Sequence, residues 1–73
     1  MSAKEMFEEL GYEIDSTYEI EGHFFYCKDY TKIDFDLSRK NFYKYHSSNL
    51  RSPIDMKLLQ AINKQVEELG WND

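Results

Sequence analysis

The stretch HFFYCKDYTKIDFDLSRKNFYKYH, residues 23–46, decides the fold. Apolar and polar side chains alternate along it in short runs, as they do in strands that bury one side and expose the other. With the residues before it, the alternation predicts a short lead-in and a main strand at about 18–28, a second strand at 32–37 and a third from Phe42. Because the intervening turns are short, these strands are expected to form an antiparallel meander.

The segment SRKN, residues 38–41, fixes the register in this interpretation. It predicts a type I turn in which Asn41 adopts the left-handed conformation that Asn tolerates, with Ser38 paired to Phe42. Each cross-strand pair then follows from the side-chain period of two. The expected pairs are Leu37 with Tyr43 and Phe35 with Tyr45 on the buried face, Asp36 with Lys44 and Asp34 with His46 on the open face, and, across the earlier turn, Tyr26 with Phe35 and Phe24 with Leu37.

Both ends of the chain show helix signals. Ser2 and Glu5 form a capping-box pattern that opens a first helix reaching about Leu10. Asp55 is the expected N-cap of a second helix, next to a hydrophobic staple between Ile54 and Leu59. The expected apolar stripe of this second helix is Met56, Leu59, Ile62, Val66 and Leu69.

The tetrapeptide EELG occurs twice, in FEELGY at 7–12 and in VEELGW at 66–71. Gly11 and Gly70 both stand where a left-handed residue ends a helix, and an aromatic residue follows each of them. We interpret the repeat as two helix terminators, because no other part of the chain is duplicated. The predicted fold is therefore a single small α+β domain over 1–73: helix, three-stranded antiparallel meander, helix, with both helices packed on one sheet face.

Composition excludes several classes of protein. The net charge is -5 and the pI about 4.9, so phosphate backbones are repelled and direct nucleic-acid binding is not expected. The basic residues between 39 and 64 are spread over turns and a helix. The chain has 1 cysteine, Cys27, which rules out an intrachain disulfide and favours a cytoplasmic location. No apolar run has the length of a signal peptide or a membrane span, so no membrane partner is expected.

Catalytic and metal sites are weakly indicated. The predicted register aligns Cys27, Asp34 and His46 across three strands, but an intervening strand separates thiol and imidazole by roughly 9 to 10 Å. Three ligands on a flat surface are also a poor zinc site. With 3 glycines in the chain, a phosphate cradle is not expected, and no cofactor motif is present. We therefore predict no enzyme activity, no cofactor and no metal.

The face left open by the helices is the candidate interaction site. Phe25 and Phe42 are expected there among charged side chains, a combination typical of interfaces. Self-association as a homodimer is one alternative, and coverage by the second helix or a chain end is the other. The candidate face consists of Glu21, His23, Phe25, Asp34, Asp36, Phe42, Lys44 and His46.

The segment AINKQVEELGW (61–71), with FEELGY (7–12) and FDLSRKNFYK (35–44), resembles a family of short uncharacterised proteins encoded by phages and prophages of Gram-positive bacteria. The resemblance covers about half of the chain. It implies no catalytic or binding residues, because the family has no established activity. It does imply a small accessory protein that acts inside the host cell by binding a host or phage protein, and inhibition of host defence is one such role.

Two functions follow as expectations. The first is a non-enzymatic protein-binding module that uses the open sheet face or an exposed sheet edge. The alternative is an acidic nucleic-acid mimic that inhibits a host nuclease or defence protein. Residues 1–36 carry a net charge of -7, and their carboxylates would imitate phosphates in that case.

Overall fold

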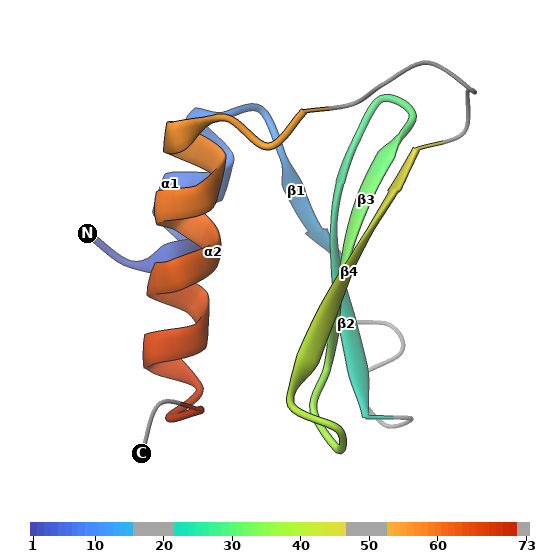
Figure 1. Ribbon diagram of the computed structural model, residues 1–73. Coiled ribbons are helices and arrows are strands. Elements are labelled where there is room, and N and C mark those ends of the chain that lie inside the picture. The colour runs from blue at the N-terminus through green and yellow to red at the C-terminus, as the bar shows by residue number, and fades with distance from the viewer. Residues whose placement is uncertain (16–21, 47–52, 72–73) are drawn as a thin grey trace.

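The computed structural model describes residues 1–15, 22–46 and 53–71. It confirms the α+β class, but the antiparallel sheet has four strands in the order β1-β2-β3-β4, where the sequence predicted three. The elements are α1 (Ala3–Glu9), β1 (Glu13–Asp15), β2 (His23–Lys28), β3 (Thr31–Asp36), β4 (Asn41–His46) and α2 (Met56–Glu68) (Figure 1).

The additional strand is β1, which the sequence pattern treated as a lead-in. It pairs antiparallel with β2, so that Ile14 lies opposite Tyr26. Gly22 has a φ of 84°, a left-handed value that interrupts an extended chain, and β2 begins directly after it. The N-terminal part of the predicted main strand, residues 18–21, lies outside the described residues.

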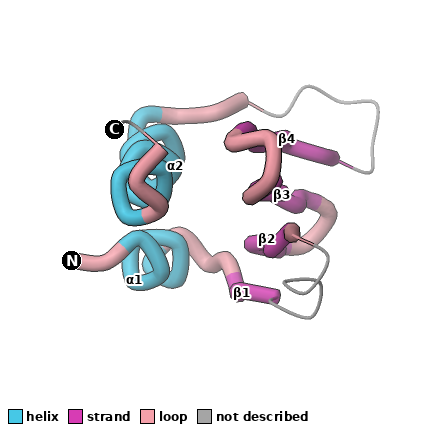
Figure 2. Tube along the Cα trace, turned by 90° about the horizontal axis from the view of Figure 1, so that it is seen from below, coloured by secondary structure: helices cyan, strands magenta, loops and turns pink. Residues whose placement is uncertain are grey.

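The molecule has two layers, with α1 and α2 side by side on one face of the sheet (Figure 2). The helices are antiparallel neighbours, because the start of α1 meets the end of α2. At that meeting point the Ala3 N–H donates to Glu68 Oε2 over 2.7 Å. The carboxylate of α2 thereby satisfies one of the N–H groups that the first turn of α1 leaves without an intrahelical partner.

The helix ends form as the sequence predicts. Ser2 Oγ accepts from the Glu5 N–H over 3.2 Å, and the Glu5 carboxylate accepts from the Ser2 N–H, which completes the capping box. At the other end Gly11 has a φ of 93°, and Tyr12 N donates to Phe7 O over 3.0 Å. This is a Schellman ending, and α2 repeats it. There Gly70 has a φ of 74°, and the Trp71 N–H donates to Val66 O.

The buried stripe of α2 differs in part from the predicted one. Asp55 is the N-cap as expected, and its side chain accepts from the Leu58 N–H over 2.8 Å. Met56 and Leu59 are exposed, however, and so is Ile54, the other half of the expected staple. Leucine and methionine occur on two adjacent faces of this helix, so their spacing alone did not show which face is buried. The structure buries the face that contains Ala61. The buried residues are Leu58, Ala61, Ile62 and Gln65.

Aromatic stacking holds the helices to the sheet. The Phe7 ring of α1 lies parallel to the Tyr26 ring of β2 with 3.8 Å between centroids, and within the sheet Phe24 stacks on Phe35 at 5.1 Å. Burying such rings supplies most of the apolar area available to a small domain. The buried cluster consists of Phe7, Tyr12, Phe24, Tyr26, Ile33, Phe35, Leu58, Ala61 and Ile62.

The β3–β4 register corrects the predicted one. Asp36 pairs with Asn41 and Phe35 with Phe42, so the turn spans residues 37–40. The left-handed residue is Lys40, with a φ of 57°, and not Asn41. The shift relative to the predicted pairing is an odd number of residues, and it therefore moves every side chain of β4 to the opposite sheet face.

Asp36 is the physical reason for this register. Its Oδ1 accepts from the Ser38 N–H, the Ser38 hydroxyl and the Arg39 N–H at 3.1, 2.9 and 3.1 Å. This Asx turn starts the reversal earlier in the chain than the predicted turn, which begins at Ser38, would. Across β2 and β3 the pairing is also shifted, with Phe24 opposite Phe35, but by two residues, so the predicted faces of those strands are kept.

Candidate functional site

The sheet face that points away from the helices, here called the outer face, carries aromatic and charged side chains in three cross-strand rows. The rows follow directly from the strand pairings, because residues paired across adjacent strands share a face. They are Glu13, Cys27, Lys32 and Tyr45 in the first, Asp15, Phe25, Asp34 and Tyr43 in the second, and His23, Asp36 and Asn41 in the third.

Half of the predicted interaction residues lie on the outer face as expected: His23, Phe25, Asp34 and Asp36. Glu21 lies outside the described residues. The three from β4 are placed differently because of the corrected register. Phe42 lies on the helix side with its ring 5.9 Å from that of Phe35, and Lys44 pairs with buried Ile33. His46 pairs with Thr31 at the end of the strand and not with Asp34.

Tyr43 and Tyr45 lie on the outer face, where the sequence predicted their neighbours Phe42, Lys44 and His46. They are 41% and 51% exposed, and their rings lie 6.2 Å apart. Tyr30, in the turn between β2 and β3, is 73% exposed. The segment FYKYH, residues 42–46, has aromatic residues at both even and odd positions, so alternation does not show which of them face outward. Only the tendency of Asp36 to start an Asx turn could have placed these tyrosines on the correct face.

A hollow of about 450 Å³, bordered by Tyr30 and Tyr45, lies on the outer face. Asp34 is 6% exposed although it stands on the face without helices, so its neighbours screen it from water. A carboxylate that is removed from water needs polar partners. The residues that line this outer hollow are Phe25, Tyr30, Lys32, Asp34, Tyr45 and His46.

Two interactions organise the outer hollow. The His23 Nδ1 lies 3.0 Å from Asp34 Oδ1, a pair that the predicted register had assigned to His46 instead. The Lys32 ammonium lies over the Phe25 ring, 4.7 Å from its centroid. The ring of His23 is in addition parallel to that of Phe25 at 6.4 Å. The face therefore combines a screened carboxylate with an aromatic surface that already holds a cation.

The geometry does not support cysteine chemistry. Cys27 pairs with Lys32 and Asp34 with Phe25, so the expected row of Cys27, Asp34 and His46 does not form. Burial raises the pKa of the Cys27 thiol, and the carboxylates of Asp15 and Glu13 add to this against the opposing effect of Lys32. A raised pKa lowers the thiolate fraction and with it the reactivity. Within residues 1–15, 22–46 and 53–71, no three potential ligands of a metal ion cluster together.

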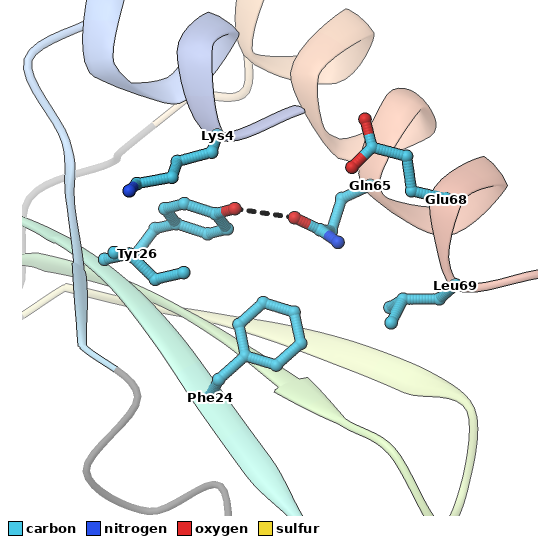
Figure 3. A pocket seen from close by; sticks show the side chains of 7 residues that line it. Lys4, Phe24, Tyr26, Gln65, Glu68 and Leu69 are labelled. Atoms are coloured by element: carbon cyan, nitrogen blue, oxygen red, sulfur yellow. Dashed lines mark hydrogen bonds between the residues drawn. The ribbon is translucent and has the colours of Figure 1, made fainter. Parts of the chain in front are cut away.

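A second hollow, of about 300 Å³, opens between the helices and the inner face of the sheet (Figure 3). The Tyr26 hydroxyl donates to Gln65 Oε1 over 2.6 Å inside it. Burial, aided by the charges of Glu68 and Glu8, raises the pKa of Tyr26 to about 12, so the hydroxyl remains a donor. Glu68 is held by the Ala3 N–H. The polar groups of this inner hollow thus serve the packing of the helices.

A third feature is an apolar group at the start of α2. Ile54, Met56 and Leu59 are 45%, 67% and 38% exposed. Their side chains are aliphatic and are not combined with a buried polar group, so these residues indicate a binding site less specifically than the outer hollow does.

Comparisons with protein-family models, curated proteins and solved structures find no match to this chain. No helix in the described part of the chain combines the length and the apolarity needed to cross a bilayer. The outer face therefore has to be interpreted from its own geometry.

Proposed function

We propose that this chain is a non-enzymatic protein-binding module whose outer face docks a host or phage protein. The resemblance to short phage and prophage proteins supports the cellular context, a small accessory protein inside a host cell. The observation that carries the proposal is the exposure of Tyr43 and Tyr45 on one sheet face, with Tyr30 in the adjoining turn, beside the screened carboxylate of Asp34.

Tyrosine on such a face suits binding to a protein. Its ring offers a large contact area with few rotatable bonds, and its hydroxyl can pair with a polar rim, so tyrosine is enriched at interfaces and among their dominant contacts. Tyr43 is already steadied, because the Asn41 side-chain amide donates to its hydroxyl over 3.2 Å. Holding the ring in place lowers the entropy lost on binding.

The test is capture of a partner by tagged protein in cells of the host. Tyr43→Ser together with Tyr45→Ser is expected to abolish recovery of a specific protein while the far-UV circular dichroism and Tm stay close to those of the unchanged chain. Met56→Ser is the control, because it removes an exposed apolar side chain from α2, away from the outer face. Loss of the partner in the control and not in the tyrosine variant would move the interface to the helix and overturn the proposal.

The salt dependence of the same complex tests the acidic-mimic alternative. A complex held by aromatic burial weakens only modestly as the salt concentration rises, whereas a phosphate-mimicking surface loses affinity steeply. Steep salt dependence with full binding by the tyrosine variant would contradict the docking face and favour the mimic.

A further inference from the structure

We propose that the outer hollow receives the guanidinium group of an arginine that the protein partner presents. The inference rests on the proposed function and makes it more specific, since it names the chemistry by which a partner would be recognised. Three features of the hollow carry it: a screened carboxylate, aromatic walls and an internal cation already seated on one of them.

The carboxylate is that of Asp34. At 6% exposure it has lost most of its hydration, and the His23 Nδ1 lies 3.0 Å from its Oδ1. A neutral imidazole can donate that bond without bringing a positive charge to the carboxylate. A screened carboxylate of this kind interacts more strongly with a cation than an exposed one does. Asp34 also lines the hollow, so the charge is presented to an incoming ligand.

The walls are aromatic. Phe25, Tyr30 and Tyr45 all border the hollow, and the Lys32 ammonium lies 4.7 Å from the Phe25 ring centroid. This contact shows that the ring face accepts a cation in the folded chain. Lys32 itself is exposed, so its flexible stem can move away when a ligand enters. The lysine thus occupies the place that a partner's cation would take.

Arginine fits these features better than lysine does. Its planar guanidinium stacks on aromatic rings and presents several N–H donors to one carboxylate, whereas the compact lysine ammonium is strongly hydrated. The net charge of -5 also attracts a basic partner segment. An anionic ligand would find Lys32 and His46 at the hollow, but it would meet the Asp34 carboxylate as well.

The first experiment titrates the full chain, labelled with ¹⁵N, with three peptides: acetyl-Gly-Arg-Gly-amide, the same peptide with citrulline, and the same peptide with glutamate. Citrulline keeps the shape of arginine and removes its charge. The arginine peptide is expected to shift the amide signals of Phe25, Asp34 and Tyr45, and to bind about tenfold more tightly than the citrulline peptide. Equal binding of arginine and citrulline, tighter binding of glutamate, or shifts confined to α1 and α2 would overturn the inference.

The second experiment uses variants of the hollow. Lys32→Met removes the internal competitor and should tighten arginine-peptide binding roughly two- to fivefold. Asp34→Asn should abolish the preference for arginine over citrulline. If Asp34→Asn fails to fold, Lys32→Met still decides, because weaker binding of arginine by that variant contradicts a cation site. Met56→Ser serves as the control and should bind all peptides as the unchanged chain does.

The failure of this inference can be told apart from failure of the docking face. If Tyr43→Ser with Tyr45→Ser no longer captures the partner, but arginine and citrulline peptides bind the unchanged chain equally well, the docking face is supported and the arginine assignment is wrong. If the tyrosine variant still captures the partner, the outer face is not the docking face, and the arginine inference, which rests on it, is wrong as well.

Discussion

Asp36 is the residue on which the arrangement of the outer face depends. Its carboxylate is 4% exposed and accepts hydrogen bonds from the backbone and hydroxyl groups of the β3–β4 turn. The hydrogen bond from the Arg39 N–H, with those of Ser38 and the nearby His23, lowers the pKa of Asp36 against the opposing effect of burial. The same contacts select the register that brings Tyr43 and Tyr45 to the outer face.

The lowered pKa of Asp36 predicts how stability depends on pH. Because the carboxyl is more acidic in the folded chain than in the unfolded one, its stabilisation is complete above the ordinary pKa of 3.8 and is lost as the pH falls through the lower folded value. Asp36→Asn keeps an oxygen for the turn but removes the charge. Thermal unfolding followed between pH 2 and pH 6 should show a smaller acid-induced fall in Tm for this variant, and an unchanged fall would contradict the assignment.

Tyr26 and Gln65 form a buried pair whose loss is expected to be costly. Tyr26→Phe leaves the Gln65 carbonyl oxygen without its donor in a site that is 1% exposed at position 26. We expect the free energy of unfolding to fall by about 1 to 3 kcal/mol, measured by urea unfolding. The double variant Tyr26→Phe with Gln65→Leu removes both partners and should recover much of the loss. If the double variant has as low a free energy of unfolding as the single one, the Tyr26 hydroxyl stabilises the fold through packing and not through this hydrogen bond.

At the scale of the elements, the two helix endings are alike although the helices differ in length. In each, a glycine with positive φ is followed by an aromatic residue whose N–H returns to the last turn. At α1 the Lys28 ammonium also donates to Leu10 O over 2.7 Å. This cation from β2 balances the C-terminal end of a helix whose own last turn contains no basic residue.

Replacement of the terminating glycines tests these endings. Gly11→Ala should lower the free energy of unfolding by about 1 kcal/mol or more, since an L residue is strained at this positive φ. Its added Cβ would in addition lie 3.3 Å from Lys28 Cε and disturb the cap on Leu10. Gly22 provides the comparison, because its φ is similarly positive but a Cβ there meets nothing within 4 Å. Gly22→Ala should therefore cost less than Gly11→Ala in chemical denaturation, and the reverse order would contradict this explanation.

The elements also show what the sequence could and could not predict. Caps were readable because each depends on a few adjacent residues, such as Ser2 with Glu5 or Gly11 with Tyr12. The faces of β2 and β3 were readable because Phe24, Tyr26, Ile33 and Phe35 keep one parity, although Phe25 stands on the other. In β4, Phe42, Tyr43 and Tyr45 do not, so its face depended on the turn alone, and the predicted turn over residues 38–41 began too late in the chain. The His23–Asp34 pair of the candidate site was missed because the predicted β2–β3 pairing was offset by two residues, which placed Cys27 and not Phe25 opposite Asp34.

At the scale of the whole molecule, the two faces of the sheet differ in what covers them. The inner face is covered by α1 and α2 (Figure 2) and contains the buried aromatic cluster, whereas the outer face has exposed tyrosines beside the screened carboxylate of Asp34. This division predicts opposite consequences for aromatic substitutions on the two faces. Stability should depend on the inner rings and binding on the outer ones.

Phe7 is the sharpest test of this division. It is 0% exposed and its ring contacts those of Tyr12, Tyr26 and Phe35, so it joins α1 to the sheet. Phe7→Ala should cost about 3 to 5 kcal/mol. A domain of this size has a total stability of roughly 4 to 11 kcal/mol, so the substitution would remove about a quarter of it or more. Tyr45→Ser, at a half-exposed ring, should change stability by no more than about 0.5 kcal/mol.

Amide hydrogen exchange separates the two expectations. In Phe7→Ala, protection should fall together in α1, α2 and the central strands, because a thin core opens as one unit. In Tyr45→Ser, protection should be unchanged while binding to the partner is lost. Exchange that accelerates only in α1 of the Phe7→Ala protein would mean that the sheet and α2 are stable without the first helix, and that the outer face does not depend on it.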